Sequence, residues 1–244
     1  MLQAAPPSPQ AENPPRRPLR TLDEFTGSLA QKVYLSLKDA ILTLTFGPGE
    51  ILRKPEICAE LGVSRSPVAE AVARLAAESL VDVVPQAGTF VARFSMDEIR
   101  EGAFLREALE VAAIDMVART VTEEQLVQLR RSLRVQEALI ADGDTIGFHQ
   151  QDAQMHELLL SFTGFRRLPM LSETAWVHVN RARRLVLPAP GRIAATLCEH
   201  HAILAALEAR DPEAARAAAQ LHLRQLVRVL EPLVVERPDL FAPR

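Results

Sequence analysis

The stretch that most restricts how this chain can fold is residues 52–92, where two short helical patterns are followed by a hairpin pattern. Gly62-Val63 separates the two helical patterns and fits a tight turn. In the second pattern, apolar residues recur at the i, i+3, i+4, i+7 spacing of a helix with one buried face. These residues are Val68, Ala71, Val72 and Leu75.

Proline and serine mark where the two helices are expected to begin. The first opens at Pro55, because the first turn of a helix leaves N–H groups without partners and proline lacks that group. The second opens at Ser66-Pro67, where the serine hydroxyl accepts a hydrogen bond from a free N–H and Pro67 takes the first helical position. Residues 80–84 and 89–91 are predicted to form the strands of the hairpin.

The face of the second helix opposite its apolar stripe carries small, polar or charged side chains. A helix pair whose second member presents such residues at its N-terminal end has the geometry for entering the major groove of DNA. The hairpin would then be a wing beside it. These residues are Ser64, Arg65, Ser66, Ala69, Glu70 and Arg74.

The sequence LGVSRSPVAEAVARLAAESLV at residues 61–81 resembles the winged helix-turn-helix of GntR-family bacterial transcription regulators. Pro85, Gly88 and Val91 match the wing of that family. The resemblance implies a double-stranded DNA operator as partner, with Ser64, Arg65 and Ser66 contacting it. The full set of predicted DNA-binding residues is Ser64, Arg65, Ser66, Arg74, Gly88 and Thr89.

Three positions depart from the family pattern. Ala69 and Ala87 stand where the family usually has arginine, and Pro55 stands where some members contact phosphate. Residues 1–92 contain nine Lys and Arg against ten Asp and Glu, although phosphate neutralisation normally supplies much of the affinity for DNA. We therefore expect weaker DNA binding or an unusual operator. The alternative is a winged helix used only for protein contacts.

Composition sets the broad class of the protein. With 244 residues and 48% hydrophobic content, the chain can form one or two domains with a real core. No run of 18 apolar residues occurs, so we expect no membrane span. The N-terminal sequence lacks a secretory pattern, and Cys58 and Cys198 lack CxxC spacing, so we expect buried free thiols and a cytoplasmic location.

The predicted organisation is a mainly α protein. It has a disordered tail at 1–25, a winged helix-turn-helix domain at 26–93 and an all-α antiparallel helical bundle at 97–236. Capping boxes at 95–98 and 122–125 predict helix starts, and Gly and Pro mark the helix ends. In the bundle, helices are expected at about 97–119, 122–141, 145–163, 167–187, 192–209 and 212–236.

The bundle resembles the FCD effector domain that follows the winged domain in FadR-type GntR regulators. The segments that carry the resemblance are 104–110, 152–156, 199–204 and 221–223. The resemblance implies a homodimer that binds a small carboxylate effector at a metal centre. Repression relieved by the effector is the commoner direction in the family.

Helical spacing predicts which polar residues of the bundle point inward. Asp152 and His156 are four residues apart and share one face, which also carries Phe148, Met155 and Leu159. His200 shares a stripe with apolar residues, whereas His201 shares a face with Glu208. His222 lies on the apolar stripe of the last helix.

Three inward histidines and one aspartate suit a divalent transition metal: Zn, Ni, Mn or Fe. The predicted ligands are Asp152, His156, His200 and His222, which match the metal pattern of the family. Taken singly, each histidine is more often a hydrogen-bonded core residue, and Asp152 could pair with an arginine. His149 is a weaker candidate, and the position of His178 is left open.

A carboxylate effector needs a cationic contact besides the metal, and Arg106 matches the arginine of the family's opening helix. Arginine binds carboxylates with two parallel hydrogen bonds. The alternative is a surface ion pair between Arg106 and Glu110 at i, i+4. Arg181, Arg183 and Arg184 could serve similarly, but a solvated face is the more common use of such residues.

Two functions of different classes follow. The first is a ligand-responsive transcription regulator, in which an acid bound at the metal shifts the bundle and changes the spacing of two recognition helices. A regulator that responds to metal alone is a variant of it. The second is a metal-dependent enzyme, since His and Asp sites with open positions can activate water. The sequence favours the regulator, because a winged helix has no role in the enzyme.

Overall fold

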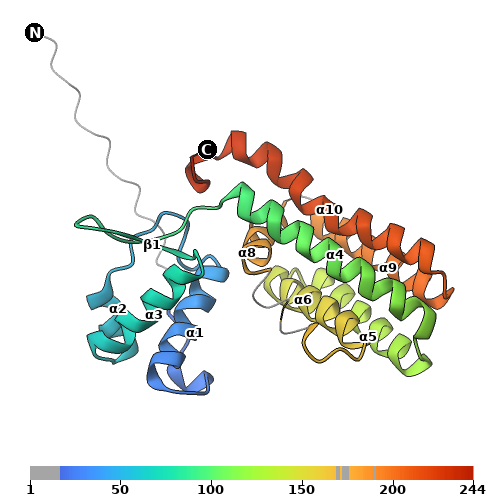
Figure 1. The fold of residues 1–244 in the computed structure, drawn as a ribbon, viewed down its shortest axis with the longest axis horizontal. Helices are drawn as coiled ribbons and strands as arrows, with labels where there is room; N and C mark the ends of the chain where they lie inside the picture. The colour runs from blue at the N-terminus through green and yellow to red at the C-terminus, as the bar shows by residue number, and fades with distance from the viewer. Residues whose placement is uncertain (1–16, 169–170, 172–175, 190, 244) are drawn as a thin grey trace, which may run out of the picture.

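The computed structural model describes residues 17–168, 171, 176–189 and 191–243. It is mainly α, with a winged helix-turn-helix followed by a helical bundle, as the sequence predicts (Figure 1). The winged part contains a 3₁₀ helix (η1), three α-helices and a two-stranded hairpin. Their bounds are η1 Leu22–Glu24, α1 Leu29–Leu42, α2 Lys54–Leu61, α3 Arg65–Ala77, β1 Val81–Val84 and β2 Gly88–Val91.

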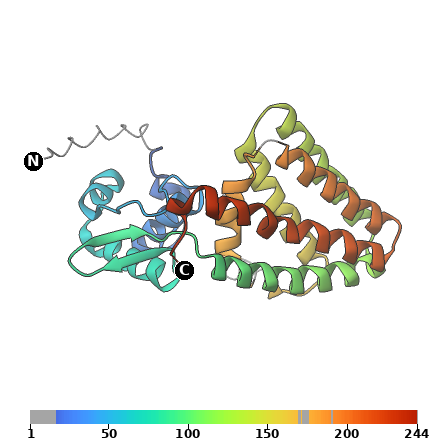
Figure 2. The same cartoon turned by 90° about the horizontal axis from the view of Figure 1, so that it is seen from above.

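The bundle follows along the rest of the chain. Helix α10 packs against α4 and α9, while α5 packs against α6 and α9 (Figure 2). Residues 169–170 and 172–175 of the helix expected at 167–187 lie outside the described residues. The bounds are α4 Met96–Thr120, α5 Glu123–Ala141, α6 Thr145–Ser161, α8 Val177–Val186, α9 Arg192–Glu208, α10 Pro212–Glu236 and a final 3₁₀ helix, η2 Pro238–Leu240.

The recognition helix α3 begins two residues earlier than expected. Its N-cap is Ser64, and Ser66 and Pro67 lie inside its first turn. Proline is tolerated there because the first four N–H groups of a helix have no intrahelical partner. Gly62 ends α2 with a left-handed backbone (φ 64°), a conformation that glycine adopts without strain.

The core of the winged part is apolar. Leu37 and Ile41 of α1, Leu75 of α3 and Val91 of β2 are all fully buried in one cluster. In the hairpin, Val81 pairs with Val91 and Val84 pairs with Gly88. Helix α3 packs on α1 with Leu75 in this shared core, and the face of α3 that carries Arg65, Ala69 and Glu70 is exposed.

The chain before η1 is part of this folded unit. Leu19 is buried in the same core, and its N–H donates to Glu60 Oε1 at 2.7 Å. Leu19 and η1, which fall in the segment expected to be a disordered tail, are thus packed in the winged part, and residues 1–16 lie outside the described residues.

The apolar face of α4 is wrongly predicted by periodicity. The spacing of apolar residues over 97–119 predicts that Phe104, Leu105, Ala112 and Met116 point inward, but all four are exposed, with Phe104 at 72% and Met116 at 40%. The inward face instead carries Arg106 and Glu110 together with small and β-branched residues. Apolar residues occur on both faces of α4, so spacing alone could not choose between them.

Helix α8 lies between the winged part and the bundle (Figures 1 and 2). Val177, at its start, is buried in the winged core. The linker residue Phe94 is buried as well, and its N–H donates to the carbonyl of Leu240 near the C-terminus. The two parts are thus joined by packed contacts as well as by the short segment of chain between β2 and α4.

No helix among the described residues is long and apolar enough to span a membrane. Both cysteines are free, as expected. Cys58 is half-buried and Cys198 is exposed, which corrects the expectation of two buried thiols.

Candidate metal centre and DNA-contacting face

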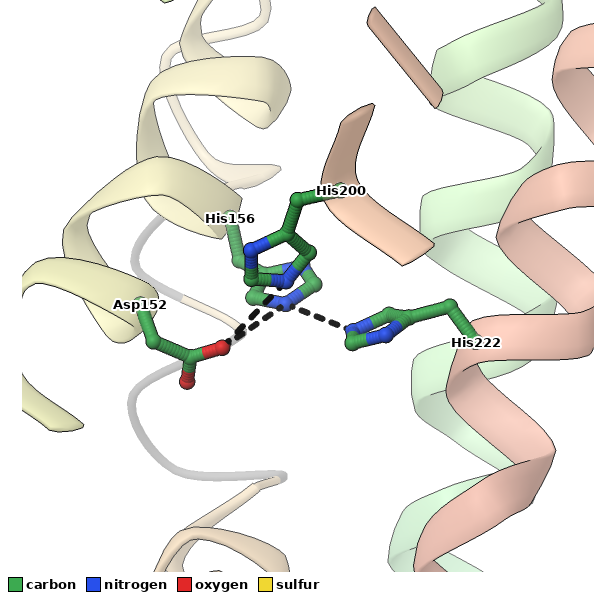
Figure 3. A group of neighbouring side chains, drawn as sticks. All are labelled: Asp152, His156, His200 and His222. Atoms are coloured by element: carbon green, nitrogen blue, oxygen red, sulfur yellow. Dashed lines mark hydrogen bonds and ion pairs between the residues drawn. The ribbon is translucent and has the colours of Figure 1, made fainter. Parts of the chain in front are cut away.

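The structure brings Asp152, His156, His200 and His222 together in the middle of the bundle (Figure 3). Asp152 and His156 come from successive turns of α6, His200 from α9 and His222 from α10. All four are buried, and each offers one atom such that the four atoms lie within 4.8 Å of one another.

The Nε2 atoms of the histidines point toward a common position. His156 Nε2 and His222 Nε2 are 3.1 Å apart, and His200 Nε2 lies 3.4 Å from Asp152 Oδ1. Asp152 Oδ1 is also 3.9 Å from His156 Nε2. Three imidazole nitrogens and one carboxylate oxygen thus face the same small volume.

Each histidine is held from behind through its Nδ1 atom. Glu110 Oε2 contacts Nδ1 of His156 at 2.6 Å, and Glu199 Oε2 contacts Nδ1 of His222 at 2.7 Å. Nδ1 of His200 meets Gln136 Oε1 at 2.8 Å. A histidine that donates Nδ1–H presents the lone pair of Nε2, which is the arrangement found around metal-bound histidines.

Two of these outer carboxylates are themselves bound to arginine. Arg106 Nε donates to Glu110 Oε1 at 2.6 Å, and Arg192 Nη2 donates to Glu199 Oε2 at 2.6 Å. Burial alone would raise the pKa of Glu110, but Arg106 and His156 hold it well below its usual range. Glu110 is therefore an anion that fixes the ring of His156.

Burial lowers the pKa of His156, His200 and His222 below the ordinary range of histidine. The neutral imidazole is the form that binds metals. Among the described residues, Asp152 Oδ1 and His200 Nε2 are buried without a hydrogen-bond partner. Buried polar atoms are rarely left so, and a cation bound by both would satisfy them.

The donor set fits a divalent transition metal with Asp152, His156, His200 and His222 as ligands. Three nitrogens and one oxygen suit Zn, Ni, Mn or Fe. Such an ion would act as a Lewis acid that binds an anionic ligand at positions the protein leaves open.

Arg106 is buried at 4% exposure and does pair with Glu110 at i, i+4. The alternative interpretation expected this pair at the surface, but both side chains are buried. Its Nη2 atom has no hydrogen-bond partner among the described residues, and its side chain lines a small cavity next to His222. Arg106 thus supports His156 through Glu110 and keeps one guanidinium nitrogen without a partner among the described residues.

Arg183 and Arg181 are also buried, which corrects the expectation of a solvated face. Arg183 forms an ion pair with Oδ2 of Asp152 and lines the same cavity. Arg181 covers the ring of Phe94, with 4.5 Å between its Cζ and the ring centroid. The sequence could not predict which of these arginines are buried, because α8 carries three of them within four residues. Their burial is decided by the packing around α8.

The other histidines have separate environments. His201 is 47% exposed and meets Glu137, so His200 faces inward and His201 outward, as spacing predicts. His149 is buried outside the four-residue cluster, where burial and Arg183 lower its pKa to about 3. His178 lies between the two parts, with Nε2 3.2 Å from the carbonyl oxygen of Glu78.

The predicted DNA-contacting residues separate into two groups. Ser64, Arg65 and Ser66 are exposed together at the start of α3. Arg74 lies at the other end of α3, where it stacks 3.8 Å above the ring of Tyr34 and hydrogen-bonds Gln31 of α1.

On the wing, Gly88 is half-buried at the start of β2. The side chain of Thr89 is 5% exposed. Alternation along β2 directs Thr89 and Val91 to the core, and an inward side chain does not reach DNA. We therefore withdraw Thr89 from the expected set.

Two family models match the chain. The model "Bacterial regulatory proteins, gntR family" matches residues 29–91, and the FCD domain model matches residues 101–225. The protein belongs to the GntR family. The matched regions contain α3 and all four residues of the candidate metal centre, respectively.

Relatives of this GntR regulator cover most of its length. A regulator in an unstable DNA locus of Streptomyces ambofaciens is 34% identical, over 86% of this chain and 88% of its own. The transcriptional repressor RspR of Escherichia coli is 30% identical, over 89% and 95%. A putative GntR regulator from Rhodococcus has a solved structure with a TM-score of 0.73 at 28% identity, over 84% and 99%.

The family and these relatives are transcriptional regulators and not enzymes. The sequence preference for a regulator is therefore confirmed, and the alternative of a metal-dependent enzyme is set aside. Sequence reasoning missed Gln136 and Glu199, and it expected Glu110 and Arg183 at the surface. The i, i+4 spacing of Arg106 and Glu110 could have indicated that Glu110 is held as an anion, whereas nothing in the sequence indicated a role for Gln136.

Proposed function

We propose that this protein is a homodimeric repressor whose operator affinity is controlled by a small carboxylate bound at the metal centre. The observation that carries the proposal is the convergence of three Nε2 atoms and Asp152 Oδ1 near Arg106, whose Nη2 has no hydrogen-bond partner among the described residues. The metal would hold a carboxylate group of the effector, and Arg106 would donate a hydrogen bond to the effector. The name of the E. coli relative as a repressor supports the direction of control.

Helix α8 provides a path from this centre to the recognition helix. Arg183 of α8 is paired with the candidate ligand Asp152. One and a half turns earlier, His178 contacts the carbonyl of Glu78, the C-cap of α3, and Val177 is packed into the winged core. A ligand that shifts Arg183 would move α8 as a rigid rod and tilt α3 relative to the bundle.

The exposed apolar face of α4 supports the homodimer. Phe104, Ala108, Ala112 and Met116 line a surface hollow of about 680 Å³. Two ion pairs border it, Glu107 with Arg224 and Asp115 with Arg216. A patch with an apolar centre and both charge signs at its rim can meet its own copy across a two-fold axis. Two copies of α3 would then face the half-sites of a two-fold operator.

A regulator that responds to metal alone is the second candidate. Its support is the completeness of the four-residue ligand set, which needs no acid to hold an ion. The two candidates differ in one respect. In the pure metal sensor, the metal alone produces the whole change in DNA affinity. In the first candidate, the change requires the acid as well as the metal.

The domain arrangement that we propose assigns residues 26–93 to DNA binding and 97–236 to effector binding and dimerisation. The DNA-contacting residues would be Ser64, Arg65, Ser66, Arg74 and Gly88. Arg74 would act mainly by fixing α3 on α1, given its stacking on Tyr34. Because such a regulator works on chromosomal DNA, we propose a cytoplasmic location.

The test is fluorescence-anisotropy titration of DNA from upstream of the protein's own gene, with scrambled DNA of equal length as control, across a salt series. We expect a specific excess that persists at moderate salt. An acid should release the DNA from metal-loaded protein and not from chelated protein. Equal binding to both DNAs would contradict the proposal.

Arg65→Ala separates base reading from phosphate contact in the same assay. Loss of a base contact relaxes sequence preference, whereas loss of a phosphate contact weakens all DNA about equally. Arg53→Ala, an exposed arginine paired with Glu56 before α2, is the matched control for a change of charge alone. We expect relaxed preference for Arg65→Ala only.

A further inference from the structure

The cavity beside His222 is small and strongly cationic. Its volume is about 30 Å³, and Arg106, Arg183 and Arg192 all line it together with Thr196. A cavity of that size holds about two water molecules. It therefore leaves room for the polar end of a short ligand next to the candidate metal ligands, and not for a bulky one.

The charges around this cavity cancel in pairs. Arg106 pairs with Glu110, Arg192 with Glu199, and Arg183 with Asp152. When the three histidines bind a metal they are neutral, because a ligating imidazole nitrogen carries no proton. The protein groups thus sum to zero, and a divalent metal would leave two uncompensated positive charges in a buried site, which is costly.

Two of the arginines can still donate. Arg106 Nη2 is buried without a hydrogen-bond partner among the described residues. Arg183 contacts Asp152 through Nη2, and a guanidinium has five N–H donors in all. One side of the cavity would therefore offer a metal ion and the other side two guanidinium groups.

We propose that the effector is a short dianion with two carboxylates, one bound at the metal and the other clamped by Arg106 and Arg183. This inference rests on the proposed function and specifies its ligand. Two negative charges neutralise the site, whereas a monocarboxylate leaves one positive charge buried. Arg183 would distinguish dicarboxylates from monocarboxylates, because it lies next to the candidate metal ligand Asp152 and can donate to a second carboxylate.

The experiment compares succinate with succinamate, its half-amide, which has nearly the same shape and one charge fewer. Isothermal titration calorimetry of the full-length protein loaded with Co²⁺ measures both affinities above neutral pH. We expect succinate to bind at least about tenfold more tightly, equal to 1.4 kcal/mol. Butyrate, which lacks the second polar group, should be weaker still. The Co²⁺ absorption spectrum reports whether a carboxylate reaches the metal.

Arg183→Gln tests the assignment of the second carboxylate. We expect the variant, saturated with Co²⁺, to bind succinate no more tightly than succinamate. Arg184→Gln is the matched control, because its neighbour Arg184 does not line this cavity, and it should keep the preference. If Arg183→Gln does not fold, the wild-type comparison still decides.

Equal affinity of the wild-type protein for succinate and succinamate would overturn the inference, as would an unchanged preference in Arg183→Gln. Those results leave the metal centre and acid binding intact. If the protein binds no Co²⁺, or binds no acid once loaded, the proposed function itself fails, and this inference fails with it.

Discussion

The two parts of the protein are built around opposite kinds of core. Among the described residues of the winged part, Ser36 and Thr89 are the buried polar side chains, and the rest of its core is apolar. The bundle buries a charged and polar set in its middle. That set is Arg106, Glu110, Ser132, Gln136, His149, Asp152, His156, Arg181, Arg183, Thr196, His200 and His222.

This difference indicates what each part does. Apolar burial stabilises a fold without any ligand, so the core of the winged part, which includes Val177 of α8, needs no ligand to hold α3 in place. Buried charges and unpartnered polar atoms cost stability, so the bundle contains a centre that a bound ion and ligand would complete. We therefore expect ligands to act first on the bundle, and we expect α8 to pass the change to α3.

The largest expected effect is on the bundle. A metal present at about a thousandfold its Kd stabilises a folded protein by about 4 kcal/mol. His200→Ala and His222→Ala should lose bound metal by elemental analysis and lose this stabilisation in thermal unfolding. His201→Ala should keep both, since His201 is exposed and paired with Glu137. Metal loss only in His201→Ala would contradict the assignment.

The winged core should respond to packing and not to metal. Leu75→Ala removes a fully buried side chain that holds α3 on α1, and such changes cost about 2–5 kcal/mol. Chemical unfolding of the winged part should show this loss in the free energy of unfolding. The loss should be the same with metal present and after the metal is removed by a chelator. A dependence on metal would mean that the two cores are not separate.

The outer carboxylates should strengthen metal binding without binding the metal themselves. Glu110→Gln and Glu199→Gln remove the anions behind His156 and His222, and such changes typically reduce metal affinity 10–100-fold. Competition with a chromogenic chelator measures the loss. Glu137→Gln, behind the exposed His201, is the matched control and should change nothing.

Coupling between the parts should depend on His178. His178→Ala removes the contact with the C-cap of α3, while the metal ligands are untouched. Coupling energies of this kind are about 1–3 kcal/mol, so we expect the acid to release DNA less effectively, with metal content unchanged. Full acid response in His178→Ala, measured by anisotropy, would exclude this contact as the path.

The smallest expected effect is a pH dependence of the same contact. Burial lowers the pKa of His178, with Glu98 opposing and Arg181 adding to the shift. A histidine whose folded pKa lies below its unfolded value of about 6.5 stabilises the fold above that pH, and this contribution is lost as pH falls through the window between the two values. Stability measured below pH ~6.5 should fall less in His178→Gln than in the wild type.

Most of the architecture could be predicted from local patterns. Gly62 and the stripe from Val68 to Leu75 placed the two helices of the winged part. The helical facing of His200 against His201 was correct because burial of a helix follows a fixed period of 3.6 residues. The four residues that meet at the centre each lie on such an inward stripe.

Other features had no local signal. On α4, both faces carry apolar side chains, and only the packing of α10 and α6 decided that Arg106 and Glu110 point inward and Phe104 outward. Likewise, Arg183 and Thr89 were placed by what surrounds them. Propensity and spacing describe one element at a time, whereas the burial of a charge is set by partners on other elements.

The sequence by itself therefore determined the family, the order of the elements and the identity of the candidate ligands, because these follow from contiguous motifs and helical period. Only the tertiary structure decided the outer partners Glu110, Gln136 and Glu199, the cavity with its arginines, and the placement of α8 between the parts. Each of these depends on side chains from different helices meeting in space, and that information lies in long-range packing and not in any one segment.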